Sequence, residues 1–384
     1  MKALQARWRV MLLVLILITL VVSFGLLSFG YYYAETLKDG ALKPDREPDE
    51  LDLEVAAIDE DRVTLRLTDK AEEDGDWAHR GTFGLEWAGG YAQVGKILDR
   101  DDGQVVREFF PRQGTLRVGD MVRLDSFAFP GDPQQAHGIP FQEVTFPAGL
   151  GDFPAWFVDG SADTWAIFVH GRGANRRESL RMLPVFHRLG LPSLVITYRN
   201  DEEAPSSADG YYRLGETEWE ELQAAAQYAA DRGAERLILV GYSMGGAIVT
   251  SFLLRSSFAE LVEGVILDAP MLDFEAIIDR ESRDRGVPGL LTNLGKAIAG
   301  WRFDIHWGEV DYLSRADELT VPILLFHGDA DDTVFVETSD TLAKIRPDIV
   351  TYVRSAGVDH VRSWNAGPAA YEATVREFVA RLIE

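Results

Sequence analysis

Ser243 stands in the run ILVGYSMGG, residues 238–246, with a glycine two positions before it and another two positions after it. This spacing fits either a flexible surface turn with an incidental serine or a nucleophile held on a strained turn. The motif follows the buried-type strand LILV and begins an apolar helix, which is the setting that a nucleophile elbow requires. A Cβ at Gly241 or Gly245 would crowd so tight a turn. The sequence therefore predicts that Ser243 is an exposed nucleophile.

A serine hydroxyl is a weak nucleophile at neutral pH, so it needs an imidazole to take its proton and a carboxylate to orient that imidazole. In a strand–turn–helix setting of this kind the order along the chain is serine, acid, histidine. Of the seven histidines, only His360 lies beyond the late strand-end acids. Those acids are Asp329, Asp331 and Asp332, and residue types alone leave all three open. A calcium loop of EF-hand spacing does not fit the cluster, which lacks the glycine at position 6 and the closing glutamate.

The elements that must position these residues alternate between strand and helix from residue 136 onward. Helices are expected at 177–189, 216–231 and 244–254. The strand-like runs between and around them are AWFVDG, TWAIFVHG, SLVITYR, RLILVG, GVILDA, VPILLFHG and IVTYVRS. Buried apolar strands that alternate with helices are typical of a doubly wound, mostly parallel α/β sheet, which we expect over residues 136–384.

Residues from about 270 to 318 lie between two of these strands and are expected to form a helical cap. The cap could act as a lid whose apolar face lines an acyl pocket, or it could simply pack on the sheet. Trp301, Phe303 and Trp307 are the residues that would distinguish the two arrangements.

Residues 139–384 resemble the α/β hydrolases, the superfamily of serine esterases, lipases and peptidases. The motifs that carry the resemblance are VHGRGAN, GYSMGG, HGDADDTV and GVDH. The resemblance implies a Ser–Asp–His triad, and in the family's HG-x-x-D-x-x-V pattern the acid falls on Asp331. Asp329 and Asp332 become second choices. Asp268 is a more distant candidate, because some relatives place the acid one strand earlier.

The resemblance also implies an oxyanion hole made of two backbone N–H groups, those of Met244 and Arg172. Such donors stabilise the charge that develops on the carbonyl oxygen, and losing one costs about 3 kcal/mol. The side chains of Arg172 and Arg176 could recognise an acidic group on the substrate, although solvated or locally paired arginines are favoured. His170 and His327 each precede a glycine at a strand end, where a structural hydrogen bond is favoured over proton transfer.

The N-terminal segment has no charged residue from position 10 to position 34, which as a helix exceeds the roughly 30 Å of a bilayer's hydrocarbon core. Three basic residues precede this run and Glu35 and Asp39 follow it, so the positive-inside rule places the N-terminus in the cytoplasm. A cleaved signal peptide is the main alternative, but no small-residue cleavage site is evident. We expect residues 1–36 to anchor the chain in the cytoplasmic membrane, and the charged residues 37–50 to form a linker.

Residues 51–135 consist of short alternating runs with turn signals and predict a small all-β domain, a barrel or a sandwich. Asp102 and Gly103 lie between two strand-like runs and predict a hairpin turn. The sequence offers no function for this unit.

Composition narrows the function further. The 384 residues are 46% hydrophobic, enough for about two domains. A net charge of −24 argues against nucleic acid as a partner. The chain has no cysteine, which excludes disulfides, thiolate catalysis and cysteine-bound metals. No metal or organic cofactor is implied.

The expected function is that of a membrane-anchored serine hydrolase, carboxylesterase- or lipase-like, working outside the cytoplasmic membrane. Its substrate would be a small-molecule or lipid-like ester. One alternative is a serine peptidase of related fold, and another is a catalytically inactive binding module on a hydrolase fold.

Overall fold

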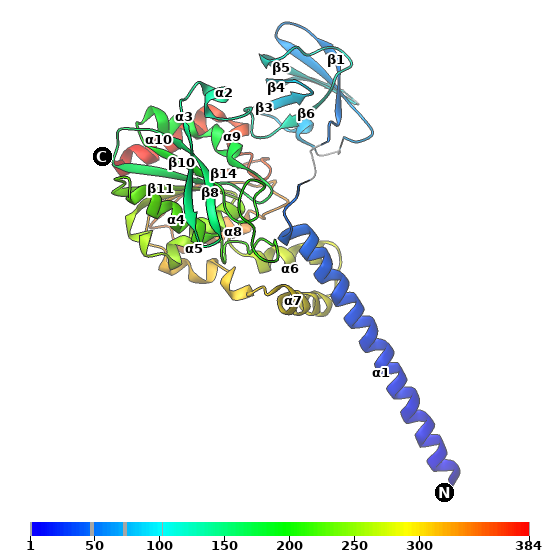
Figure 1. Cartoon of the computed structure of the whole chain (residues 1–384). Helices are drawn as coiled ribbons and strands as arrows, with labels where there is room; N and C mark the ends of the chain where they lie inside the picture. Colours follow the sequence, from blue (N-terminus) through cyan, green and yellow to red (C-terminus); the bar gives the residue numbers. More distant parts are fainter. Residues whose placement is uncertain (1, 47–49, 72–74, 102, 384) are drawn as a thin grey trace.

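The computed structural model describes residues 2–46, 50–71, 75–101 and 103–383. It consists of a long N-terminal helix, a β-barrel and a larger α/β unit (Figure 1). In this view the barrel lies at the upper right of the α/β unit, and the N-terminal helix extends from its lower right.

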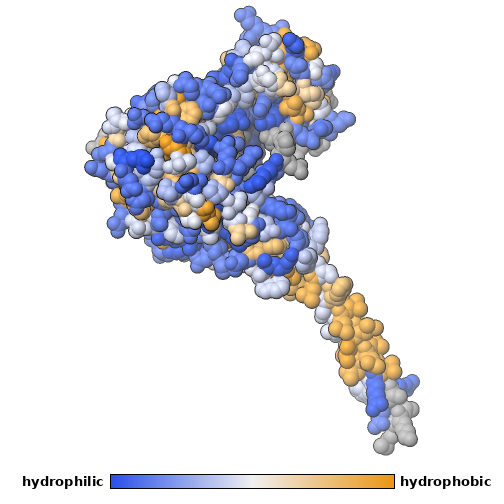
Figure 2. All heavy atoms as spheres, in the orientation of Figure 1, coloured by the Kyte–Doolittle hydropathy of each residue, from blue (hydrophilic) through white to orange (hydrophobic). Residues whose placement is uncertain are grey.

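The N-terminal helix α1 spans Lys2–Leu37 and continues into a π-helical turn at Lys38–Leu42. Most of α1 projects away from the folded body, and Figure 2 shows an apolar band along its exposed length. Within the described residues, it is the one helix long and apolar enough to span a membrane. The expected linker 37–50 begins as helix rather than loop, because Leu42 is buried and its carbonyl accepts a hydrogen bond from the Tyr212 amide at 2.8 Å. Residues 47–49 lie outside the described residues.

The all-β unit is a closed six-stranded barrel with strand order β1-β2-β5-β4-β3-β6. Its strands are β1 (Leu53–Ile58), β2 (Arg62–Leu67), β3 (Phe83–Trp87), β4 (Gly90–Asp101), β5 (Gln104–Gln113) and β6 (Met121–Asp125). All neighbours pair antiparallel, and alternate side chains fill the interior. Of the two predicted arrangements, the barrel is confirmed. Gly103 has a φ of 95° in the β4–β5 turn, and Asp102 lies outside the described residues.

The α/β unit contains an eight-stranded sheet with strand order β14-β13-β12-β11-β9-β10-β8-β7. The neighbouring pairs from β14 to β10 are parallel, and β8 and β7 add an antiparallel edge. The predicted mostly parallel sheet is therefore confirmed. Its strands are β7 (Gln142–Ala148), β8 (Gly151–Val158), β9 (Thr164–Val169), β10 (Ser193–Ile196), β11 (Arg236–Tyr242), β12 (Val262–Asp268), β13 (Ile323–Gly328) and β14 (Val350–Ser355).

Helices cover both faces of this sheet. On one face lie α3 (Leu183–Arg188) and α10 (Pro368–Ile383), and on the other lie α4 (Trp219–Ala230), α5 (Met244–Arg255) and α8 (Glu337–Ile345). Strand β11 contributes side chains to the cores on both faces of the sheet, because alternate strand residues point to opposite faces. Leu237 and Leu239 lie in one core, and Ile238 and Val240 lie in the other.

The helix expected at 177–189 is divided in two. A 3-10 segment spans Arg176–Arg181, and α3 starts only at Leu183. Pro184 explains the break, because proline has no N–H for an i→i−4 bond and is tolerated only in the first turn of an α-helix.

The segment between β12 and β13 contains two helices, α6 (Phe274–Asp284) and α7 (Gly289–Phe303). Short 3-10 turns follow at Trp307–Glu309 and Leu313–Glu318. The remaining short helical segments are α2 (Pro133–His137), α9 (Ser363–Ala366), Asp76–Ala78 and Ser257–Leu261.

The barrel is attached to the α/β unit by polar contacts. Asp76 accepts hydrogen bonds from Arg362 at 3.0 and 3.2 Å. The Asn365 side chain donates to the carbonyls of Thr82 and Ser126, at 2.7 and 2.9 Å. These contacts join the barrel to the segment that directly follows residue 360.

Candidate active site

Ser243 occupies the turn between β11 and α5 with φ 50° and ψ −118°. A non-glycine residue at positive φ is strained, and such strain persists only where the surroundings hold it. Neighbouring backbone does so here: the Ser243 amide donates to Asp268 O at 3.0 Å, and Gly246 N donates to Ser243 O at 2.9 Å. A Cβ on Gly245 would lie 2.2 Å from Val169 O, so no larger residue fits the turn without displacing backbone.

The side chain of Ser243 reaches His360. Ser243 Oγ lies 2.9 Å from His360 Nε2, and His360 Nδ1 lies 2.7 Å from Asp331 Oδ2. Because a carboxylate only accepts, Nδ1 must carry the proton, which leaves Nε2 free to accept from the serine hydroxyl. That is the tautomer a general base requires. His360 keeps 20% of its side chain exposed while Asp331 is buried.

Both oxygens of Asp331 are fully engaged. Oδ2 accepts from His360 and, at 3.0 Å, from His327 Nε2, while Oδ1 accepts from the amides of Thr333 and Val334 at 2.9 and 2.8 Å. Burial disfavours the charged carboxylate, but the hydrogen bonds from the two histidines outweigh it and lower the pKa of Asp331. Asp331 therefore stays ionised beside the imidazole.

The other three acids considered from the sequence lie elsewhere. Asp329 accepts from the Gly357 amide at 2.7 Å, and Asp332 is exposed. Asp268 is buried at the end of β12, where its Oδ1 accepts from Ser363 Oγ at 2.8 Å. Burial raises the pKa of Asp268 to about 6. The structure brings Asp331 to His360 and gives the other acids other partners.

Within the described residues, one group of acids could be considered for a metal ion. Asp331, Asp332 and Asp359 each offer a carboxylate oxygen within 4.8 Å of the others. Asp331, however, already accepts from two histidines and two amides, so its acceptor positions are filled. The donor set does not fit a metal site.

The loop after β9 passes directly beside Ser243. A Cβ on Gly171 would lie 3.1 Å from Ser243 Cβ. The amide of Gly171 is occupied, since it donates to Glu178 Oε2 at 2.8 Å, so the next amide, that of Arg172, is the candidate donor from this loop. Met244 begins α5, and the first amides of a helix have no intrahelical acceptor. These two positions are compatible with the oxyanion hole predicted at Met244 and Arg172.

The two arginines near this loop differ in their surroundings. Arg172 is exposed, and its guanidinium donates to Lys43 O at 3.3 Å. Arg176 is buried and forms ion pairs with Glu143 and Glu203, each at 2.5 Å. Arg176 is therefore locally paired, as the sequence favoured.

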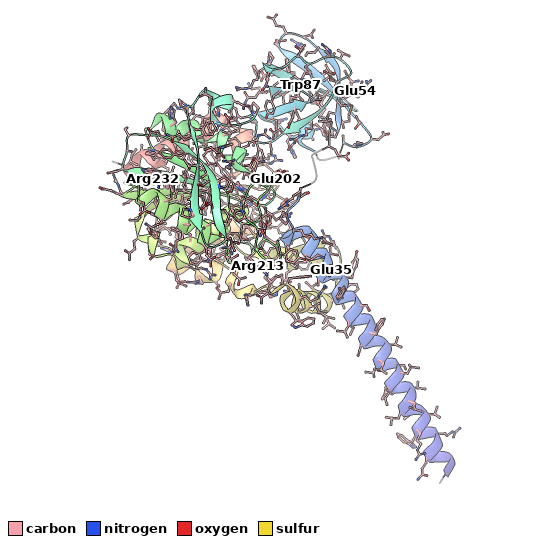
Figure 3. All side chains as sticks on the ribbon, in the orientation of Figure 1. Glu35, Glu54, Trp87, Glu202, Arg213 and Arg232 are labelled. Atoms are coloured by element: carbon pink, nitrogen blue, oxygen red, sulfur yellow. The ribbon has the colours of Figure 1, made fainter. Side chains whose placement is uncertain are left out.

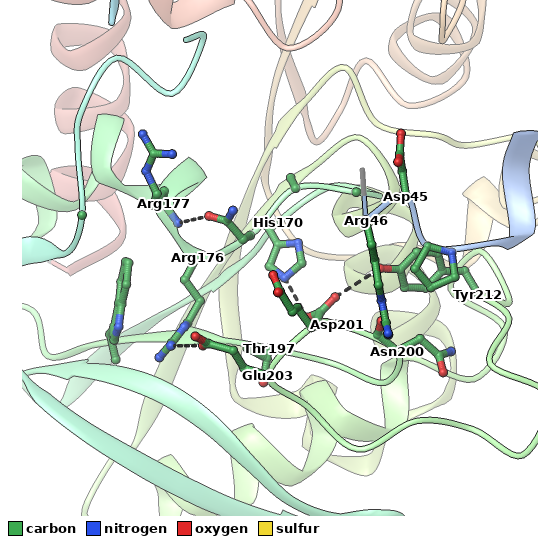
Figure 4. A pocket seen from close by; sticks show the side chains of 17 residues that line it. Asp45, Arg46, His170, Arg176, Arg177, Thr197, Asn200, Asp201, Glu203 and Tyr212 are labelled. Atoms are coloured by element: carbon green, nitrogen blue, oxygen red, sulfur yellow. Dashed lines mark hydrogen bonds and ion pairs between the residues drawn. The ribbon is translucent and has the colours of Figure 1, made fainter. Parts of the chain in front are cut away.

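A cavity of about 300 Å³ lies on the other side of the loop (Figure 4). His170 forms its inner wall, where Nδ1 lies 2.9 Å from Gly171 O and Nε2 lies 2.9 Å from Asp201 Oδ2. Both partners accept, so both ring nitrogens must donate. Burial opposes this charge, but Asp201 outweighs it and raises the pKa of His170. The buried ion pair holds the loops after β9 and β10 together, which is a structural role.

The three cap aromatics are not equivalent. Phe303 is buried, and Trp307 stacks on Phe274 with ring centroids 5.8 Å apart. Trp301 is 83% exposed and faces away from the protein interior. Trp301 therefore lines no acyl pocket in this structure.

Sequence reasoning did not give the partners of two residues that touch the site. His327, for which a structural hydrogen bond was favoured, donates to Asp331 and also contacts Ser339 Oγ at 2.7 Å. Arg362 donates to the His360 carbonyl at 3.2 Å while it binds Asp76 of the barrel. The HG dipeptide at the end of β13 was a sequence signal for His327. No sequence pattern indicates that Arg362 contacts Asp76.

Comparisons with known proteins agree with this architecture. A family model described as "Alpha/beta hydrolase family" matches residues 166–383, more than half of the chain. A second model, a domain of unknown function (DUF8805), matches residues 54–125, within the barrel. None of the curated proteins compared with the chain matches it.

Solved structures of esterases are similar at low sequence identity. The esterase Pf2001 of Pyrococcus furiosus is 17% identical with a TM-score of 0.53, and the match covers 67% of this chain and 98% of that one. An esterase of Thermogutta terrifontis with malate bound is 16% identical with a TM-score of 0.46, covering 63% and 100%. At such identities the first likeness shows a shared fold.

Proposed function

Because this chain belongs to the α/β-hydrolase family, we propose that it is a serine hydrolase that cleaves carboxylic esters through an acyl-enzyme. The observation that carries the proposal is the hydrogen-bond chain from Ser243 through His360 to Asp331. Ester cleavage is favoured over peptide cleavage because it is the less demanding acyl transfer on this fold.

In the first half-reaction, Ser243 Oγ attacks the ester carbonyl carbon while His360 Nε2 takes the hydroxyl proton. Asp331 stabilises the imidazolium that forms. The amides of Met244 and Arg172 would donate to the developing oxyanion. His360 then gives its proton to the leaving alkoxide, and the C–O bond of the ester breaks.

In the second half-reaction, water attacks the acyl-enzyme. His360 takes a proton from this water and returns it to Ser243 Oγ as the acid product leaves. Besides the ester and this water, each step uses only residues of this chain.

A fluorophosphonate probe and a panel of p-nitrophenyl esters test the nucleophile. We expect labelling of the full chain, and we expect Ser243→Ala to lose both the label and ester turnover, by at least about 10⁴-fold in kcat. Ser257→Ala, at the exposed serine that follows α5, is the matched control and should behave like wild type. If Ser243→Ala retained the label, the proposal would be wrong, and if wild type took no label, an inactive binding module would be favoured.

We further propose that α1 anchors the enzyme in the cytoplasmic membrane with the catalytic unit outside. The length and apolarity of α1 and the basic residues before its uncharged run support this orientation. External protease added to intact cells should digest the catalytic unit of the full chain. Protection from protease until the cells are lysed would reverse the proposed topology.

A further inference from the structure

Helix α7 carries an apolar stripe on its outer face. Its inner face packs on the protein through Thr292, Gly295, Lys296, Ala299 and Phe303, which are all buried. The opposite face presents Leu290, Leu294, Ala297 and Trp301, spaced four, three and four residues apart, so that they form one line along the helix. Leu290 is 74% and Trp301 83% exposed.

This helix packs closely on the anchor helix α1. A Cβ on Gly30 would lie 2.6 Å from Ile298 Cδ1, and a Cβ on Gly295 would lie 3.2 Å from Tyr33 Cβ. One glycine on each helix therefore permits the close approach, as small residues do between membrane helices. In Figure 1 α7 is seen nearly end-on while α1 is seen lengthwise, so the two helices cross steeply.

Polar contacts fix the same crossing. Glu35 forms an ion pair with Arg302 at 2.5 Å, and the Arg302 guanidinium lies 4.0 Å from the centre of the Tyr31 ring. Figure 3 shows Glu35 on the part of α1 that adjoins the folded body, beside α7.

The position of the α7 contact along α1 indicates how deep in the bilayer this contact would lie. The uncharged run 10–34 is about 37 Å long at 1.5 Å per residue, and the hydrocarbon core is about 30 Å thick. The last residues of the run, which contact α7, therefore lie at the membrane–water interface. Tyr31 and Tyr32 are 51% and 65% exposed there, and tyrosine and tryptophan both favour this layer.

We propose that α7 is a second membrane contact, in which Leu290, Leu294, Ala297 and Trp301 lie in the lipid interface of the bilayer that α1 crosses. The inference rests on the proposed anchoring through α1. Lipid is the occupant because Leu294, at the α1 contact, makes the stripe continuous with the lipid-facing surface of α1. The four residues are uncharged, so the contact needs apolar lipid rather than anionic headgroups.

Because the chain has no cysteine, single cysteines can carry an environment-sensitive fluorophore at chosen sites. Full-length Ala297→Cys, Leu20→Cys and Val118→Cys are labelled and placed in phosphatidylcholine nanodiscs. The lipids carry a nitroxide quencher either near the headgroup or deep in the acyl chain. Leu20 reports on α1, and Val118, exposed on the barrel, is the matched control outside the membrane.

We expect the Leu20 label to be quenched most by the deep nitroxide and the Val118 label to be unaffected. The Ala297 label should be quenched several-fold more than the Val118 label, most strongly by the nitroxide near the headgroup, and equally at low and high salt. If Leu20 is quenched and Ala297 is not, the inference fails while the anchoring stands. An apolar emission spectrum of the Ala297 label without quenching would mean that protein, not lipid, covers the stripe. That result would also overturn the inference. If Leu20 is not quenched, both the anchoring and the inference fail.

Discussion

Asp331 is the residue whose chemistry depends most on its neighbours. Its two oxygens accept four hydrogen bonds, two from histidines and two from amides. Asp331→Asn would place an amide N–H where an acceptor is needed, so His360 would adopt the wrong tautomer. We expect kcat for p-nitrophenyl esters to fall by about 10⁴-fold.

Two neighbouring acids provide controls for that change. Asp329→Asn and Asp332→Asn alter acids in the same loop that make no hydrogen bond to His360 among those the structure describes. Both variants should keep kcat close to wild type. A loss at either of them that matched the loss at Asp331 would remove Asp331 from its assigned role.

Asp268 is predicted to make stability depend on pH. Burial raises its pKa from 3.8 to about 6, although the Ser363 hydrogen bond opposes the shift, so the folded state holds the proton more tightly than the unfolded state. The free energy of unfolding therefore falls as the pH rises from 3.8 to about 6. Asp268→Asn keeps an acceptor for Ser363 without the charge. It should be more stable than wild type at pH 8 by up to about 3 kcal/mol.

Thermal unfolding of the full chain in detergent at pH 8 and pH 4.5 measures this effect. The advantage of Asp268→Asn should narrow at the lower pH, because wild type regains most of the stability that it loses as the pH rises from 3.8 to about 6. An advantage that did not change between the two pH values would contradict the assignment. Asp332→Asn, which removes the charge of an exposed acid instead of a buried one, is the control.

For single residues, the sequence predicted which residues belong to the candidate site better than it predicted their hydrogen-bond partners. Ser243 and His360 could be named because a motif and the order along the chain singled them out. The acids near residue 330 are chemically identical in sequence, and only the resemblance to a family selected Asp331. The bond from His327 to Asp331 depends on how the loop after β13 folds back, which no periodicity records.

Among the elements, the β11–α5 turn has no room for an added Cβ at Gly245. A Cβ on Gly245 would meet two backbone oxygens, at 2.2 Å from Val169 O and 2.6 Å from His170 O. Backbone cannot rotate away as a side chain can, so Gly245→Ala should displace the elbow from β9. We expect a clear fall in Tm together with loss of ester turnover.

Gly149→Ala is the matched control for this prediction. Gly149 lies in the β7–β8 turn, and a Cβ there would meet nothing within 4 Å. Its Tm and activity should stay near wild type. If Gly245→Ala were as well tolerated as Gly149→Ala, the steric account of the elbow would be wrong.

Elements were predicted best where one physical pattern dominated. Parallel strands buried on both faces are continuous apolar runs, so the strands of the sheet were evident from sequence. The helix at 177–189 was expected as one piece because apolar spacing says nothing of the backbone donor that Pro184 lacks. The helical turn at 38–42 was missed because its stability comes from Leu42 packing on the α/β unit, a tertiary contact.

In the whole molecule, the barrel contacts the His360 loop through Arg362. Arg362 donates to the His360 carbonyl at 3.2 Å and binds Asp76 of the barrel at 3.0 and 3.2 Å. Asp76→Ala would leave Arg362 without this partner and allow the His360 loop to shift. We expect kcat to fall about tenfold or more while KM changes little, because small misplacements of a catalytic group are costly.

Glu54→Ala is the control on the same barrel. Glu54 forms an exposed pair with Arg66 on the side away from the α/β unit, as Figure 3 shows. Exposed pairs contribute little, so its activity should not change. Asp76→Glu should restore part of the turnover. If Asp76→Ala lowered only Tm, the barrel would contribute stability and not positioning.

The contacts between the barrel and the α/β unit could not be predicted from the sequence. The barrel and the α/β unit could each be expected from their own patterns. Their interface pairs residues almost three hundred positions apart, such as Asp76 with Arg362, and it is made of polar side chains that any surface carries.

The glycine-mediated contact between α1 and α7 restricts how the α/β unit can turn about the proposed anchor. An enzyme held in this way at a fixed height would meet membrane-borne esters by lateral diffusion. Its velocity would follow the number of substrate molecules per unit area of bilayer, so diluting them with inert lipid would slow turnover even at constant total concentration.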